Sequence, residues 1–409
     1  MIKITTRKNR TKSQLHSDVE NSFEQFKLRQ DIGFVNLPFD QNALLESKKM
    51  ASEILKNFSH LVLVGIGGSS MGPRALTEIS HSSRISFLDN VDSAETEKVI
   101  TNLNDLSKTA WLMISKSGST IEVLWNLELI NQIYSEANTP FWPNTFYITE
   151  ETTSSLQQVA VKHHRPYLKI PLDVGGRFSV LSPVGLVTAE YLKLSATDIL
   201  NGAQAALKDK TNIIECVAQY LESFKRKENI TLFWFYNSNM RWFGSWLQQL
   251  WAESLGKKNT LTGGVATDFS TPMVSIGTCD QHSVLQQIIE GPKNKFVNIF
   301  RFNDVETSKY SVKKTSFPET EILRGLNYGE LIKAEAIATE QALQLSEVST
   351  LAFELDALDS KNIGFLFMFF QLVIATLGEH ENINAFDQPG VALGKKLTLD
   401  YLKQSKSLL

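Results

Sequence analysis

Short apolar runs alternate with longer amphipathic runs along much of this chain, and this alternation limits the folds open to it. Four runs are typical of strands: HLVLVGI (60–66), ISFLDN (85–90), TAWLMIS (109–115) and TFYIT (145–149). The stretches between them are long enough for crossover helices. The sequence therefore predicts an α/β fold, in which a parallel sheet carries helices on both faces.

A second series of strand-like runs, NITLFWFY (229–236) and KFVNIFRF (295–302), follows a polar stretch and a helix-like run. A chain of 409 residues is long for a single core, so we expect two domains that meet near residue 225. The predicted division is an N-terminal segment (1–40), a first domain (41–225), a second domain (226–385) and a helical tail (386–409). The tail is expected to pack back on the body.

Composition and charge narrow the possible functions. The hydrophobic fraction of 42% and the charged fraction of 21% are those of an ordinary globular protein. A formal net charge of −3 gives no argument for binding nucleic acid or an anionic membrane. The most apolar stretch, 365–378, is short for a membrane span and contains Gln371, so it predicts a buried core helix. Two distant cysteines and a polar N-terminus without the apolar core of a secretory signal predict a cytoplasmic protein.

The first strand-like run ends in a glycine-rich loop that partly matches a dinucleotide fingerprint. Gly65 and Gly67 fit G-x-G-x-x-G, but Ser70 replaces the third glycine, and Asp89 lies near the place of a ribose-binding acid. Gly68, Ser69 and Ser70 add backbone and hydroxyl donors that would suit a smaller phosphate. A tight strand-to-helix turn would also need glycine. The loop by itself leaves these alternatives open.

A second polar loop, SKSGSTIEV, follows the third strand-like run. We expect Ser119 to be the N-cap of the next helix, with Glu122 reaching back in a capping box. The apolar side chains that this helix is expected to bury are Ile121, Leu124, Trp125 and Ile130.

The residues before this helix could hold an anion. Ser115, Lys116 and Ser117 lie at the carboxyl end of a strand and beside a helix N-terminus, where backbone N–H groups favour negative charge. A serine-rich loop with one solvated lysine is the alternative. Because the glycine loop should reach the same sheet edge, two hydroxyl-rich loops favour a monophosphate over a pyrophosphate.

Four other side chains could take part in chemistry. Gln249 and Glu253 share one face of a predicted helix, although Glu253 and Lys257 have the spacing of a surface ion pair. Arg177 follows two glycines. Its guanidinium could either point at a ligand from a turn that these glycines allow or lie on the surface. His282 lies alone in a polar loop. The histidines and cysteines show no metal-ligand spacing, and there is no nucleophile elbow or complete P-loop.

Six of these stretches together resemble the glucose-6-phosphate isomerase family. They are GIGGSSMGPRAL, SKSGSTIEV, GGRFSVLSPVGL, QQLWAESLGK, GTCDQHS and FDQPGVALGK, and they keep the family's order over about four-fifths of the chain. The resemblance implies two sugar-isomerase (SIS) domains, each a mostly parallel sheet flanked by helices. It also implies interconversion of glucose 6-phosphate and fructose 6-phosphate, in glycolysis and gluconeogenesis, with no metal or organic cofactor.

The resemblance assigns roles residue by residue. Glu253 would be the base that moves a proton between C1 and C2, and Arg177 would stabilise the enediolate. His282 and Lys395 would open the sugar ring, His282 reaching the site from the other subunit of a homodimer. The residues implied in substrate binding are Gly68, Ser69, Ser115, Lys116, Ser117, Thr120 and Gln249.

Two positions depart from the family pattern. Ala392 stands where a glutamate is usual, and Val123 stands where longer members have a threonine.

Other functions stay open beside the implied one. They are an isomerase that also accepts mannose 6-phosphate, a non-catalytic sugar-phosphate sensor, and a nicotinamide-dependent oxidoreductase suggested by Gly65, Gly67 and Asp89.

Overall fold

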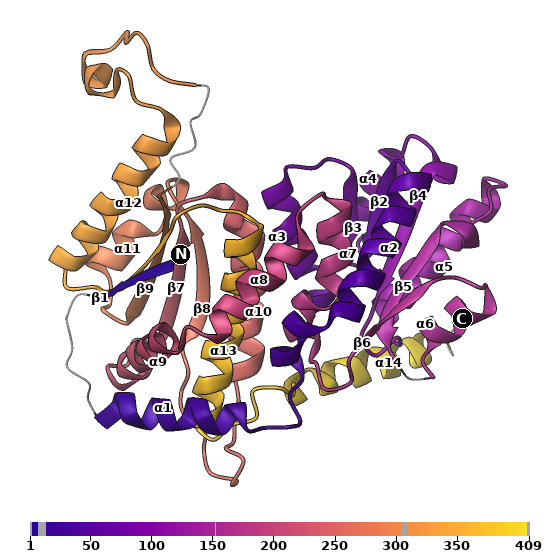
Figure 1. Cartoon of the computed structure of the whole chain (residues 1–409), viewed down its shortest axis with the longest axis horizontal. Coiled ribbons are helices and arrows are strands. Elements are labelled where there is room, and N and C mark those ends of the chain that lie inside the picture. The colour runs from indigo at the N-terminus through magenta and orange to yellow at the C-terminus, as the bar shows by residue number, and fades with distance from the viewer. Residues whose placement is uncertain (1, 7–13, 152, 304–309, 407–409) are drawn as a thin grey trace.

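The computed structural model describes residues 2–6, 14–151, 153–303 and 310–406 and places two five-stranded sheets in neighbouring lobes (Figure 1). Helices cover both faces of each sheet, so the predicted α/β class is confirmed. The strands are β1 (Ile2–Thr6), β2 (His60–Val64), β3 (Ile85–Leu88), β4 (Thr109–Ile114), β5 (Thr145–Glu150), β6 (Tyr167–Ile170), β7 (Ile230–Phe235), β8 (Thr271–Ile276), β9 (Lys295–Phe302) and β10 (Ser349–Leu355).

The α-helices connect these strands and carry most of the site's side chains. They are α1 (Gln14–Lys27), α2 (Gln41–Asn57), α3 (Met71–Ser80), α4 (Ser93–Thr101), α5 (Ile121–Glu136), α6 (Ser155–Lys162), α7 (Pro183–Tyr191), α8 (Ala196–Leu207), α9 (Lys210–Lys225), α10 (Arg241–Leu255), α11 (Leu285–Glu290), α12 (Tyr328–Leu345), α13 (Ser360–His380) and α14 (Ala392–Lys406).

Both sheets repeat one strand arrangement. The first has the order β3-β2-β4-β5-β6, and all its neighbouring strands are parallel. The second has the order β1-β10-β9-β7-β8, in which only β1 runs antiparallel. If β1 is set aside, β7, β8, β9 and β10 occupy the places that β2, β3, β4 and β5 occupy in the first sheet. The loops at the carboxyl ends of corresponding strands therefore have corresponding positions.

The N-terminus belongs to the second sheet, which the sequence did not indicate. Strand β1 pairs with β10, so that Ile4 lies opposite Phe353, and α1 packs against α9 and α13. Residues about 350 positions apart in the sequence thus pair at one edge of the sheet. A local hydrophobic pattern does not indicate a pairing between residues so far apart.

Helix α13 lies in the core, as predicted for its apolar stretch. It is the one helix among the described residues that is long and apolar enough to span a membrane, and 83% of its most apolar window is buried inside the molecule. Gln371 is fully buried and donates a hydrogen bond to the carbonyl oxygen of Phe178 at 3.0 Å. This bond ties the core helix to the segment that carries Arg177.

The C-terminal tail is helical but does not pack back on the body. Helix α14 runs beneath the first lobe (Figure 1), and the side chains of Leu393, Leu397 and Tyr401 are 64%, 56% and 71% exposed. These residues are four apart and form one apolar stripe. The expectation that the tail packs back on the body is therefore wrong, because this stripe finds no complementary surface on the described part of its own chain.

Candidate active site

Two loops meet at the carboxyl edge of the first sheet. The connection after β2 leads to β3 on one side, whereas the connection after β4 leads to β5 on the other, so the point between β2 and β4 is a topological switch point. Parallel sheets commonly bind ligands there. The loop after β2 holds Gly65 to Ser70, and the loop after β4 holds Ser115 to Thr120.

The glycine loop contacts two other parts of the site at close range. Gly67 has a φ of +59°, and a Cβ added there would lie 2.9 Å from Nε2 of Gln249. A Cβ on Gly68 would lie 2.2 Å from the carbonyl oxygen of Gly176, too close for any side chain. Glycine at both positions lets the loop approach both α10, which carries Gln249 and Glu253, and the segment that carries Arg177.

The start of α5 differs from the predicted capping box. The N-cap is Thr120 instead of Ser119, and no side chain among the described residues caps this helix. The Thr120 hydroxyl instead pairs with that of Ser115 at 2.7 Å, and Ser119 donates its hydroxyl hydrogen to Oγ of Ser117 at 3.2 Å. No side chain of the described residues therefore caps the first N–H groups of α5, and free N–H groups at a helix start favour an anion.

Lys116 stands at the same edge. Its ammonium group donates to the carbonyl oxygen of Leu172 at 3.0 Å and lies 3.9 Å from Oε2 of Glu150. Ser115 and Ser69 are buried, whereas Ser117 is exposed. A positive charge, several hydroxyls and an uncapped helix N-terminus are thus gathered around one place, which is what binding a phosphate requires.

The buried face of α5 also differs from the prediction. Ile121 and Trp125 are 49% and 64% exposed, whereas Ile130 is buried as expected. The side chains that face the sheet include Val123 and Leu127. Because the helix starts one residue later than predicted and its sequence is apolar on more than one side, the sequence did not single out the buried face. Val123, one of the two departures from the family pattern, therefore serves in the core.

Helix α10 brings Gln249 and Glu253 to the glycine loop. Gln249 donates from Nε2 to Oε1 of Glu253 at 3.1 Å, as their spacing on one helix face allows. The second carboxylate oxygen of Glu253 accepts from Nη1 of Arg177 at 3.2 Å. The Glu253 side chain is 32% exposed, so its carboxylate is held by two partners and still open to a ligand.

Arg177 is buried and fixed on every side. Its side chain is 1% exposed, and Nε donates to Oγ of Ser254 at 2.8 Å. The remaining guanidinium bonds, at 2.6–3.0 Å, go to the segment before α14: Oε1 of Gln388 and the carbonyl oxygens of Ala385 and Asp387. Burial lowers the pKa of Arg177, and the nearby Glu253 carboxylate opposes this change. The guanidinium is thus a rigid cation beside the Glu253 carboxylate.

Lys257 does not form the surface ion pair suggested by its spacing from Glu253. Its ammonium group donates instead to the backbone carbonyl oxygens of Glu253, at 2.7 Å, and Asp387, at 2.6 Å, and lies 3.1 Å from Oδ1 of Asp387. Burial is the main cause that lowers the pKa of Lys257. Lys257 thus ties the end of α10 to the segment before α14 and leaves the Glu253 carboxylate to Gln249 and Arg177.

The residues that hold Arg177 were not predicted from the sequence. Ser254 follows Glu253 directly, and Asp387 and Gln388 belong to the FDQPG stretch that carried part of the resemblance. That stretch was the available signal, but nothing in its composition shows that it contacts a segment about 210 residues earlier.

Asp89 bears on the dinucleotide alternative. Both of its carboxylate oxygens accept from Arg74, at 2.6 and 2.7 Å, and the Arg74 side chain lies over the rings of Phe87 and Trp242. The acid that would bind a ribose is therefore already engaged. This arrangement favours a phosphate site over a dinucleotide site at the glycine loop.

His282 and Lys395 lie apart from the group formed by Arg177, Gln249 and Glu253. His282 ends the short 3₁₀ helix Cys279–His282 after β8 and is exposed. Lys395 is exposed on α14, one turn after Ala392, where that helix begins. No contact joins either side chain to Glu253 within the described part of a single chain. Among the described residues no group of three or more His, Cys, Asp or Glu side chains could hold a metal ion.

Comparison with known proteins gives consistent matches over nearly the whole chain. The family model described as phosphoglucose isomerase matches residues 11–408. The glucose-6-phosphate isomerase of Campylobacter jejuni is 32% identical over 383 residues, which cover 91% of this chain and 92% of that protein. The crystal structure of a hypothetical protein from Thermus thermophilus has a TM-score of 0.90 at 28% identity, covering 98% of this chain and 100% of the other. The crystal structure of a glucose-6-phosphate isomerase from Chlamydia trachomatis has a TM-score of 0.84 at 21% identity. The match covers 99% of this chain and 89% of the other.

Proposed function

This chain belongs to the phosphoglucose isomerase family, and from that premise we propose that it interconverts glucose 6-phosphate and fructose 6-phosphate through a cis-enediol intermediate. The observation that carries the mechanism is the Glu253 carboxylate, which is held between Gln249 and Arg177 beside the glycine loop. The role of the reaction in glycolysis and gluconeogenesis follows from the two sugar phosphates.

Glu253 acts as the single base of the isomerisation. Conversion of the aldose to its ketose moves one carbon-bound proton from C2 to C1 and one hydroxyl proton from the C2 oxygen to the C1 oxygen. One carboxylate can remove the carbon-bound proton from C2 and return it to C1 on the same face. Gln249 fixes Oε1 and Arg177 fixes Oε2, which limits rotation of the carboxylate. The base is therefore oriented before the substrate arrives.

Arg177 stabilises the charge that appears on oxygen during the proton transfer. Its guanidinium is held by Ser254 and Gln388 and by two backbone carbonyl groups, so it needs no reorganisation when the enediolate forms. A cation fixed in a buried place acts more strongly on such a charge than one in water.

The loops after β2 and β4 bind the phosphate group of the substrate. Ser115, Lys116, Ser117 and Thr120 lie at the uncapped N-terminus of α5, and Gly68 and Ser69 belong to the facing loop. The phosphate is remote from the reacting carbons, so its binding energy serves to hold C1 and C2 in place beside Glu253.

Ring opening uses His282 and Lys395, and the protein acts as a homodimer with shared sites. Within one chain His282 is exposed on the second lobe and away from Glu253. A two-fold dimer would bring the His282 loop of each subunit to the cleft of the other. The apolar stripe of α14, exposed on the single chain, gives such a dimer surface to bury.

The proposed chemistry needs no metal or organic cofactor, since a carboxylate, a guanidinium and a proton donor are sufficient for it. We further place the protein in the cytoplasm, in line with two free cysteines and an ordinary globular composition. Mannose 6-phosphate differs from glucose 6-phosphate at the carbon from which Glu253 would take its proton, so it is a candidate second substrate.

The test is a coupled assay of fructose 6-phosphate conversion by the purified chain, with a chelator present and no metal or nicotinamide added to the isomerisation step. We expect glucose 6-phosphate to form, and mannose 6-phosphate is measured in the same samples. Binding of the sugar phosphate without turnover would identify a sensor and contradict the proposal. Turnover only with a nicotinamide cofactor would identify an oxidoreductase.

A further inference from the structure

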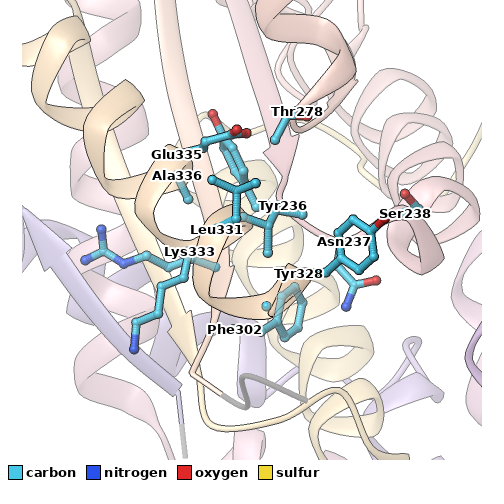
Figure 2. A pocket seen from close by; sticks show the side chains of 13 residues that line it. Tyr236, Asn237, Ser238, Thr278, Phe302, Tyr328, Leu331, Lys333, Glu335 and Ala336 are labelled. Atoms are coloured by element: carbon cyan, nitrogen blue, oxygen red, sulfur yellow. The ribbon is translucent and has the colours of Figure 1, made fainter. Parts of the chain in front are cut away.

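The second sheet has a switch point of its own. Strand β7 connects to β8 on one side and β9 connects to β10 on the other, as β2 and β4 do in the first sheet. A cavity of about 490 Å³ lies at this point, beneath α12 (Figure 2). Its walls include Tyr236, Asn237 and Ser238, which directly follow β7, and Arg301 and Phe302 at the end of β9. A cavity of this size and place is suited to a small molecule.

The cavity lacks the anion-binding device of the first sheet. Helix α12 takes the place of α5 but begins with a complete capping box. Asn327 accepts from the backbone N–H of Glu330 at 3.0 Å, and the Glu330 carboxylate accepts from the backbone N–H of Asn327 at 2.8 Å. The helix N-terminus is thus closed by a carboxylate and does not offer free N–H groups to a phosphate.

The charges around the cavity also argue against a phosphate. Arg301 is neutralised by ion pairs with two carboxylates, those of Glu340 and Glu354. Figure 2 shows the ammonium group of Lys333 turned away from Glu335 and from Tyr328. Glu335 has a buried oxygen, Oε2, that accepts no hydrogen bond from the described residues. A buried acceptor of this kind needs a donor, which a hydroxyl group can supply.

The rest of the wall combines aromatic rings with uncharged polar groups. Thr278, Asn237 and Ser238 line the cavity together with the rings of Tyr236, Phe302 and Tyr328 (Figure 2). Aromatic rings pack against the C–H groups of a ligand, whereas amide and hydroxyl groups exchange hydrogen bonds with its hydroxyls. We propose that this cavity binds a small uncharged polyhydroxy compound, a sugar or polyol without phosphate. This inference does not depend on the proposed isomerase function.

The cavity is linked to the loop that carries His282. Gln281 donates from Nε2 to the hydroxyls of Thr339, at 2.6 Å, and Tyr236, at 2.9 Å, and to the carbonyl oxygen of Glu335, at 3.5 Å. Two of these three partners, Tyr236 and Glu335, line the cavity. A ligand in the cavity would therefore contact Tyr236 and Glu335, which hold Gln281, the residue directly before His282.

The experiment is a titration of the full chain with sorbitol, followed by saturation-transfer NMR to obtain a dissociation constant. Glu335→Gln keeps the shape of the side chain but removes the charged acceptor, and we expect it to weaken binding about tenfold. Tyr328→Ala removes a ring that is 71% exposed, so folding is preserved, and should weaken binding about fivefold. The matched control is Trp125→Ala on α5, an aromatic side chain that is 64% exposed and absent from the cavity wall, which should leave sorbitol binding unchanged.

Inorganic phosphate and ethanolamine are titrated in parallel. Sorbitol binding that saturates and is weakened by both cavity variants supports the proposal. The absence of saturable sorbitol binding, or equal binding by the wild type and Glu335→Gln, would overturn it. Tighter binding of phosphate or ethanolamine than of sorbitol, lost in Glu335→Gln, would assign the cavity to a charged ligand and overturn it as well.

Discussion

Both oxygens of the Glu253 carboxylate have a partner, yet about a third of the side chain remains exposed. The partner cation, Arg177, is buried and has bonds to four other groups. The two side chains therefore differ in freedom. In the proposed mechanism this difference lets the base reach a substrate and exchange a proton, whereas the cation stays where negative charge would develop.

Replacing Glu253 by glutamine removes the base but keeps the bond to Gln249 possible. We expect Glu253→Gln to lower kcat by roughly 10²–10⁴-fold, as loss of a positioned base does in other enzymes. Binding of the sugar phosphate should persist, because the phosphate loops are separate. The measurements are steady-state kinetics and calorimetric binding, with Glu128→Gln on the exposed face of α5 as control. A kcat near that of the wild type would show that Glu253 is not the base.

His282 has a role only if the ring must be opened. His282→Ala should slow the reaction of cyclic glucose 6-phosphate much more than that of an open-chain aldose phosphate such as erythrose 4-phosphate, where the latter is accepted. The ratio of the two kcat/KM values is the readout, because it cancels general damage to the site. Equal slowing of both substrates would remove the ring-opening assignment.

At the scale of elements, the site depends on how α10 is docked against the glycine loop. Arg74, on α3 directly after that loop, lies 4.3 Å from the ring of Trp242 in the first turn of α10 and 4.4 Å from the ring of Phe87. Asp89 holds the guanidinium in place with two bonds. Because α10 also carries Gln249 and Glu253, this stack helps to set the distance between base and phosphate loops.

A double-mutant cycle tests that coupling. Arg74→Met and Trp242→Leu should each lower the free energy of unfolding, and their effects should be non-additive by about 1 kcal/mol, the size of a partly desolvated cation–π contact. The measurement is denaturant unfolding of the single and double variants. Arg74→Met combined with Trp125→Leu is the control, since Trp125 is 64% exposed on α5. Additivity in both pairs would show that the Arg74–Trp242 contact contributes nothing.

At the scale of the whole molecule, the proposed site is incomplete within one chain. Arg177, Gln249 and Glu253 meet at the first sheet, but His282 is exposed after β8 and Lys395 is exposed on α14. A dimer with shared sites accounts for this separation through symmetry, since each subunit would give its loop to the other.

Mixing two inactive variants tests the shared site. In a dimer of one Glu253→Gln chain and one His282→Ala chain, one site would receive both defects and the other neither. Random remixing of equal amounts would leave about a quarter of all sites intact by this symmetry argument. We expect activity well above the mean of the separate variants after joint unfolding and refolding. No recovery, with mixed dimers shown by mass spectrometry, would mean that His282 serves its own subunit or has no catalytic role.

Some expectations from the sequence rested on local signals that tertiary contacts replaced. The capping box at Ser119 was wrong because the helix begins one residue later, after Thr120, and the Ser119 hydroxyl donates to Oγ of Ser117 instead. The burial of Trp125 was wrong because α5 turns Val123 and Leu127 toward the sheet. The boundary near residue 225 stays a prediction, and helices α8 and α9 before it pack against α13 after it.

The sequence by itself indicated six of the ten described strands, the parallel arrangement of most of them and the motifs that identify the family, because hydrophobic period, glycine positions and motif order are local properties. Only the tertiary structure decided which side chains meet. Arg177 contacts Glu253 across 76 positions and Gln388 across 211, and β1 joins the far edge of the second sheet. Such contacts arise when separate elements pack around a common core, and no local pattern encodes the distance between elements that are far apart in the chain.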